Sequence, residues 1–124
     1  MNSMNVIVSS ANAAAATKLA ASLAPHLSGI SIGTSFEETR AAIARNRAGG
    51  AVVDLETCDL GQVQQLCREF PGTNIVCTHR LADEQMWVAA LSAGAVDCCY
   101  DGDVASILKA VGHAAALKAK RTAA

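Results

Sequence analysis

The chain has 124 residues, 52% of them apolar, and a formal net charge of −1 at pH 7. This length suits one domain with a single core, so we expect residues 1–124 to form one unit. No uninterrupted apolar run approaches the roughly 18 residues of a membrane span, and the first residues lack the pattern of a signal peptide. With this small net charge, the chain has no excess of positive charge to attract the phosphate groups of nucleic acids. We therefore expect a cytoplasmic protein that contacts neither membrane nor nucleic acid.

Apolar runs typical of strands alternate with helical patterns along the whole chain. The expected strands cover residues 6–8, 30–32, 51–53, 75–77 and 96–100. The expected helices have apolar residues three and four positions apart, and they cover residues 12–24, 36–47, 60–70, 83–93 and 103 to about 120. Ser35, Asp83 and Asp103 are suitable N-caps. Strict strand–helix repetition predicts an α/β protein, a three-layer α/β/α sandwich around a five-stranded parallel sheet.

Five cysteines are present, at positions 58, 67, 77, 98 and 99. Their odd number and the absence of a C-x-x-C spacing argue against a disulfide framework and against a structural zinc site. We expect buried or half-buried thiols that pack as small apolar side chains. Because Cys98 and Cys99 are neighbours in an expected strand, their side chains should point to opposite faces of the sheet.

Polar residues lie at the end of each of the five expected strands. In an open parallel sheet the functional crevice lies at the carboxyl ends of the strands, so these residues should share one edge. The residues are Ser9 and Ser10, Ser31 to Thr34, Asp54, Thr78 and His79, and Tyr100 to Asp103.

Three stretches together resemble the receiver domain of bacterial response regulators. They are "GAVVDLE", which ends in an acid after the third strand, "NIVCTHR", with a hydroxyl at the end of the fourth, and "ALSAGAVDCCY" leading into the fifth. The resemblance covers nearly the whole chain and implies the CheY-like, flavodoxin-like strand order 2-1-3-4-5. It also implies that Asp54 corresponds to the phosphoacceptor and that Thr78 corresponds to the residue that contacts the phosphate.

The sequence departs from the receiver pattern at the residues that carry its chemistry. The resemblance places two magnesium-binding acids where Ser9 and Ser10 stand, and a lysine where Asp101 or Asp103 stands. Magnesium is usually held by carboxylates and phosphate oxygens, and one charge pair at about 4 Å contributes up to about 4 kcal/mol at an effective dielectric of about 20. We therefore expect an atypical receiver, a pseudo-receiver that is not an enzyme, holds no metal or cofactor and lacks regulated phosphorylation of Asp54.

Such a domain is expected to signal through protein contact. The partner would be an output domain, another protein or a second copy, with a homodimer formed through the fourth helix, fifth strand and fifth helix. Trp87 and Tyr100 are the interface candidates, since tryptophan is over-represented where interfaces carry energy. The simpler interpretation of Trp87, which we favour from the sequence, is an aromatic at the edge of the core.

Two other functions stay open. One is a phosphorylatable receiver with Asp54 as phosphoacceptor and an unusual Mg²⁺ site in which Glu56 or Asp59 supplies oxygens. The other is a binder of a small phosphate ligand or flavin at residues Ser9 to Asn12, before a helix N-terminus.

The simpler interpretations are structural. Asp54 can cap the loop that follows it, and Thr78 can simply finish a strand. His79, with no carboxylate partner identifiable in the sequence, is interpreted as a surface residue rather than an acid–base catalyst. The cations Lys118, Lys120 and Arg121 suit the end of a helix.

Overall fold

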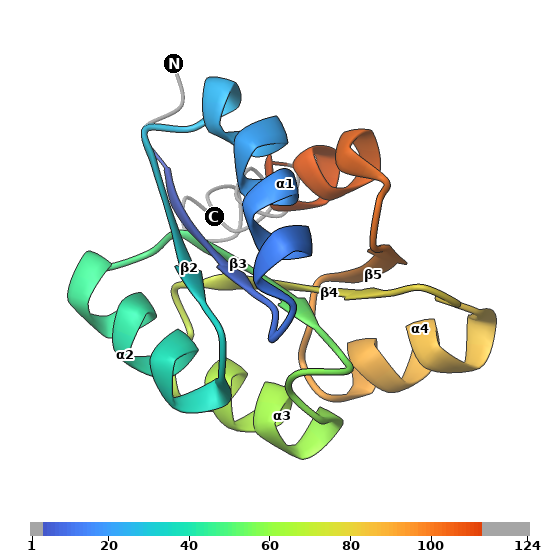
Figure 1. The fold of residues 1–124 in the computed structure, drawn as a ribbon. Helices are drawn as coiled ribbons and strands as arrows, with labels where there is room; N and C mark the ends of the chain where they lie inside the picture. The colour runs from blue at the N-terminus through green and yellow to red at the C-terminus, as the bar shows by residue number, and fades with distance from the viewer. Residues whose placement is uncertain (1–3, 113–124) are drawn as a thin grey trace, which may run out of the picture.

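The computed structural model describes residues 4–112 and contains one five-stranded parallel sheet. Its strand order is β2-β1-β3-β4-β5, as the receiver resemblance implied. The strands form where short β-branched runs are flanked by turns, and each is within two residues of its predicted bounds (Figure 1). They are β1 Asn5–Ser9, β2 Gly29–Gly33, β3 Gly50–Asp54, β4 Asn74–His79 and β5 Asp97–Tyr100.

Helices follow each strand, as the spacing of apolar residues predicted. They are α1 Ala13–Leu23, α2 Phe36–Asn46, α3 Leu60–Glu69 and α4 Glu84–Ser92, together with a short 3-10 helix, Ala24–His26, that contains Pro25. Residues 104–112 form a further helical segment after β5. The rest of the predicted last helix lies outside the described residues, as do Lys118, Lys120 and Arg121. Among the helices of residues 4–112, none combines the length and apolarity that crossing a bilayer requires.

Side-chain caps start these helices. Ser35 and Asp83 accept hydrogen bonds from backbone amides three residues on, and Asp103 accepts one from Ser106, so all three predicted caps are confirmed. Asn12 caps α1 in the same way, and Asp59 forms a reciprocal capping box with Gln62 at α3. These bonds satisfy amides that a helix leaves unpaired at its first turn.

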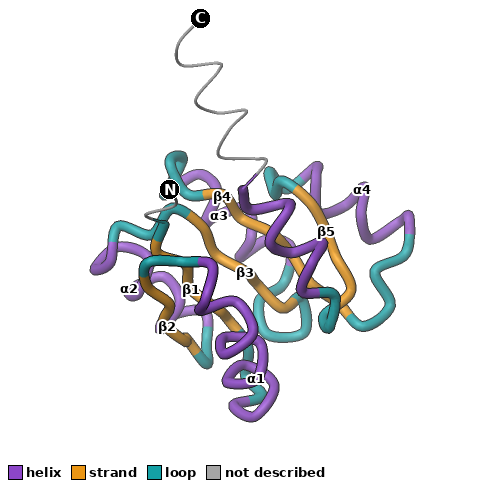
Figure 2. The backbone as a smooth tube through the Cα atoms, turned by 90° about the horizontal axis from the view of Figure 1, so that it is seen from above, coloured by secondary structure: helices purple, strands orange, loops and turns teal. Residues whose placement is uncertain are grey.

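The helices cover both faces of the sheet and give three layers. In Figure 1, α1 and the segment 104–112 lie on one face, and α2, α3 and α4 lie on the other. Seen from above in Figure 2, α1 and the segment 104–112 lie over the sheet with β3 between them.

Successive residues of the strands point to opposite faces of the sheet and pack into two separate hydrophobic cores. Ile7, Val53 and Ile75 pack under α2, α3 and α4, whereas Val8 and Val52 pack under α1 and the segment 104–112. The strands read as continuous apolar runs because both of their faces are buried.

The cysteines behave as predicted. Cys98 belongs to the core under α2, α3 and α4, and Cys99 belongs to the opposite core, so the two side chains point to opposite faces. Cys58, Cys77, Cys98 and Cys99 are buried free thiols, and Cys67 is half-buried. Burial, followed by the nearby Asp97 carboxylate, raises the pKa of Cys99 from 9.0 to about 12, which keeps this thiol protonated at neutral pH.

Candidate functional site

The polar residues predicted to share one edge of the sheet lie at the carboxyl ends of the strands. Ser9 ends β1, Asp54 ends β3 and His79 ends β4. Asp54 and Thr78 are register partners on adjacent strands. The parallel topology therefore brings residues from distant parts of the chain to one edge, but their side chains serve different contacts.

Asp54 holds its own loop together. Its Oδ1 accepts a hydrogen bond from the Glu56 amide at 3.0 Å, and its Oδ2 accepts one from the Thr57 hydroxyl at 3.3 Å. The Thr57 oxygen accepts in turn from the Ala11 amide at 2.8 Å, which ties the β3 loop to the start of α1. Both carboxylate oxygens are thus engaged within the protein.

Ser9 is 1% exposed and belongs to a directed chain of hydrogen bonds. The Thr39 hydroxyl lies 2.8 Å from the Ser35 carbonyl, which can only accept, so Thr39 donates there. Its single proton is then used, and Ser9 must donate across the 2.6 Å contact with Thr39. The Ser9 oxygen can accept from the Cys58 thiol at 3.7 Å. This chain joins β1 to α2 and to the loop before α3.

Ser10 and Asn12 organise the entry to α1. The Ser10 oxygen accepts from the Asn12 amide at 3.3 Å, and Asn12 Oδ1 accepts from the Ala15 amide at 3.0 Å. With the Ala11 amide bound to Thr57, three amides at this helix end already have side-chain acceptors. Of the first-turn amides of α1, that of Ala15 is capped, while no described residue accepts from those of Ala13 and Ala14, so part of the expected phosphate cradle stays open to a ligand.

His79 is not the surface residue that the sequence suggested. Its side chain is 13% exposed, its Nδ1 accepts from the Leu81 amide at 3.0 Å, and its Nε2 lies 3.6 Å from Glu56 Oε1. The same Glu56 oxygen accepts from Arg80 Nε at 2.9 Å. The carboxylate partner was not identifiable in the sequence because it is 23 residues away along the chain.

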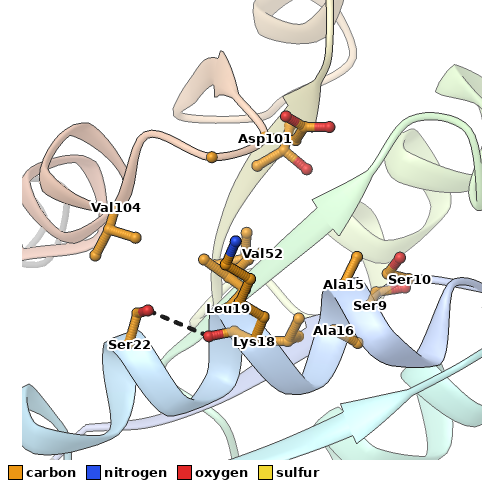
Figure 3. Close-up of a pocket in the computed structure, with 13 residues that line it drawn as sticks. Ser9, Ser10, Ala15, Ala16, Lys18, Leu19, Ser22, Val52, Asp101 and Val104 are labelled. Atoms are coloured by element: carbon orange, nitrogen blue, oxygen red, sulfur yellow. Dashed lines mark hydrogen bonds between the residues drawn. The ribbon is translucent and has the colours of Figure 1, made fainter.

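One cavity of about 280 Å³ contains four of the five predicted pocket residues: Ser9, Ser10, Thr78 and Asp101, but not His79. It lies between α1 and the start of the segment 104–112 (Figure 3). Asp54 does not line it. Asp103, the other candidate for the lysine position, caps the segment 104–112 through Ser106 at 3.2 Å and 2.7 Å. Asp101 is therefore the acid at this rim.

Lys18 also lines this cavity and was not among the predicted site residues. A helical repeat places Ala15, Lys18 and Ser22 on one face of α1, and this spacing was visible in the sequence. The strand-end argument missed it because it considered only residues that follow strands.

The residues at this edge do not fit a magnesium ion. The Asp54 carboxylate already accepts two hydrogen bonds, and the Ser9 hydroxyl donates to Thr39. Asp59 and Glu56 are used elsewhere, in the α3 cap and in the pair with Arg80. Within residues 4–112, no group of three His, Cys, Asp or Glu side chains is placed to hold a metal. No chemical step is therefore derived through a metal.

The two interface candidates lie near the β5 edge of the sheet. Trp87 on α4 is 43% exposed, and its indole Nε1 donates to Asp97 Oδ1 at 2.9 Å. Tyr100, at the end of β5, is 55% exposed. Leu81 and Val88 are also exposed. We call these four residues, Leu81, Trp87, Val88 and Tyr100, the α4–β5 surface.

Comparison with known proteins places this geometry in context. No protein-family model and no curated protein matches the chain. Solved structures do: a response regulator protein from Burkholderia pseudomallei has a TM-score of 0.78 at 23% identity, covering 95% of this chain and 72% of that one. The fold is that of a receiver domain.

Two further solved structures agree with this fold. The receiver domain of the Francisella response regulator 1452 has a TM-score of 0.79 at 14% identity and covers 96% of this chain and 98% of its own. A two-component response regulator of the LuxR family from Aurantimonas sp. SI85-9A1 has a TM-score of 0.81 at 12% identity, with 93% and 86% covered. The receiver fold is thus kept at very low sequence identity.

Proposed function

We propose that this chain is a receiver-like signalling domain of the cytoplasm that works through protein contact, without regulated phosphorylation of Asp54. The observation that carries the proposal is that the polar side chains of the site are hydrogen-bonded to other groups of the protein. Asp54 accepts bonds from Glu56 and Thr57, and Ser9 donates to Thr39, where the receiver pattern calls for an accessible phosphoacceptor and metal-binding acids.

Electrostatics support the same proposal. A transferring phosphoryl group needs a metal ion, lysine or arginine to stabilise its developing negative charge. The rim of this site has the acid Asp101 in place of the expected lysine. The negative charge of an acid at this position has the sign that opposes the reaction, whereas the positive charge of a lysine would favour it.

The α4–β5 surface is the proposed contact area. Aromatic residues are common among the residues that carry binding energy at interfaces, and Trp87 and Tyr100 are both well exposed. A second copy, an output domain or another protein would cover this surface, with the segment 104–112 beside it. Its partner would be protein, since the chain has no basic excess to attract nucleic acid.

Incubation with acetyl phosphate and magnesium, followed by intact-mass measurement, tests the proposal. We expect no stoichiometric gain of a phosphoryl group in the natural chain. Asp54→Asn is the matched control, since it removes the acceptor oxygen and keeps the size of the side chain. A stoichiometric gain that Asp54→Asn abolishes would overturn the proposal.

The second candidate function is a phosphorylatable receiver with an unusual metal site. Two observations favour it: Asp54 stays partly exposed, and it lies beside Thr78 in the strand register. The solved response regulator from Burkholderia pseudomallei has a phosphorylated aspartic acid and a calcium ion. The mass measurement above separates the two candidates.

Sedimentation analysis tests the contact surface. If the partner is a second copy, Val88→Lys should abolish the dimer, because it places a charge within an apolar interface. Leu60→Lys is the matched control, since Leu60 is also an exposed large apolar residue but lies on α3. Equal self-association of the two variants would exclude the α4–β5 surface as the dimer contact.

A further inference from the structure

The cavity between α1 and the segment 104–112 has the shape of a small-molecule site. Its volume of about 280 Å³ is near the lower limit of about 300 Å³ for ligand pockets. The apolar part of its wall comes from Ala16 and Leu19 of α1, Val52 of β3 and Val104 after β5. Small alanines on α1, at positions 15 and 16, leave this space unfilled.

Two hydroxyl groups of this cavity have unused hydrogen-bonding capacity. Thr78 is 3% exposed, and within residues 4–112 its hydroxyl makes no side-chain hydrogen bond. Within residues 4–112, Asn74 Oδ1 is the one buried side-chain oxygen or nitrogen without a partner, so the Thr78 hydroxyl is not sealed off and is open to a polar atom inside the cavity. The Ser10 oxygen accepts from the Asn12 amide, and its own proton has no acceptor among the described residues. The cavity thus offers two hydroxyl donors to a ligand.

Opposite charges flank the same cavity. Lys18 comes from α1 and Asp101 from the loop after β5, so the two lie on different walls (Figure 3). Neither forms an ion pair with another side chain of residues 4–112. A ligand with one negative and one positive group would pair with both, while a simple anion would be repelled by Asp101.

We propose that this cavity binds a small zwitterion with an apolar side chain, that is, an apolar α-amino acid. The ligand carboxylate faces Lys18 and the hydroxyl donors, its ammonium faces Asp101, and its side chain packs on Leu19 and Val52. This inference does not depend on the proposed protein contact, which concerns the α4–β5 surface. An experiment can therefore refute the amino-acid site without refuting the protein contact, and the reverse also holds.

Titration of the isotope-labelled full chain with apolar amino acids, followed by two-dimensional NMR, tests the inference. L-valine, L-leucine, L-isoleucine, L-methionine and L-phenylalanine are added in turn to millimolar concentration. At least one should cause saturable shifts centred on Ala15, Lys18, Thr78 and Asp101. The absence of saturable shifts with all five would overturn the inference.

Variants assign the contacts. Ala15→Leu fills the mouth of the cavity from an exposed helical position and should abolish binding. Thr78→Val keeps the side-chain shape without the hydroxyl and should weaken binding about tenfold, as expected for a hydrogen bond to a charged group. Lys18→Gln should weaken it about fivefold, the effect of one exposed charge pair. Lys109→Gln, an exposed lysine away from the cavity, is the matched control and should change nothing.

Ligand analogues test the charge class independently of any variant. For leucine, 4-methylpentanoate lacks the ammonium group and 3-methylbutylamine lacks the carboxylate. Both should bind more weakly than leucine, because each loses one of the two ion pairs. Equal binding of leucine and either analogue would overturn the zwitterion assignment, as would a site of shifts outside the cavity.

Discussion

Replacing Ser9 by alanine removes the central member of the hydrogen-bond chain that runs from Cys58 through Ser9 and Thr39 to Ser35. One buried hydrogen bond contributes about 1 kcal/mol net, and the Cys58 thiol is a weak donor whose lost acceptor adds little. Thr39 keeps its bond to Ser35. We expect Ser9→Ala to lower the free energy of unfolding by about 1–2 kcal/mol, or roughly 3–8 °C in Tm.

Ser9→Asp, which restores the acid of the receiver pattern, should cost more. The Ser9 side chain is buried against Thr39 and Cys58, and no described cation is paired with it. An unpaired buried charge destabilises by about 3–5 kcal/mol. An acid at this position is therefore expected to damage the fold rather than to rebuild a metal site.

Urea unfolding followed by the fluorescence of Trp87, the one tryptophan of the chain, measures both effects. Ser28→Ala is the matched control, because Ser28 is exposed and its hydroxyl makes only a 3.3 Å bond to Met4. The free energy of unfolding of Ser28→Ala should stay within about 0.5 kcal/mol of that of the natural chain. A double-mutant cycle with Thr39→Val should give a coupling of at least about 0.5 kcal/mol. Unchanged stability in Ser9→Ala, or zero coupling, would refute the directed chain.

Three other predictions follow from packing and charge. Because burial raises the pKa of Cys99 from 9.0 to about 12, the unfolded chain loses the thiol proton at a lower pH than the folded chain does. The urea midpoint should therefore stay constant below pH 9 and fall as the pH rises toward 12. In Cys99→Ala the fall should be less steep. Gly94→Ala should destabilise by about 1–3 kcal/mol in the same urea assay, since φ is +108° and a Cβ would lie 3.0 Å from another side-chain carbon, whereas Gly72→Ala, with open space around it, should not. Arg80→Ala, which removes an exposed pair, should change the urea-derived stability by less than about 1 kcal/mol.

The sequence was informative where structure depends on local pattern. Alternating apolar runs gave the five strands, and short polar side chains before helical spacing gave the caps at Ser35, Asp83 and Asp103. The parallel topology then brought Asp54 beside Thr78. Each of these features is set by residues within a few positions of one another, or by the connection rules of parallel sheets.

Contacts between distant residues were not readable from the sequence. Ser9 meets Thr39 and Cys58, which are 30 and 49 positions away, so the burial of this hydroxyl could not be foreseen. His79 finds Glu56 in the same way. For Trp87 the difficulty was different. The apolar residues of α4 lie on all sides of the helix, so their spacing does not indicate which side faces solvent.

The central claim is that the residues at the phosphorylation site of this receiver fold are hydrogen-bonded within the protein and do not bind magnesium. Magnesium titration of the isotope-labelled full chain, followed by two-dimensional NMR, tests it most directly. The account predicts no saturable shift at Asp54, Glu56 or Thr57 at millimolar magnesium. Saturable shifts centred on Asp54, absent in Asp54→Asn, would contradict it.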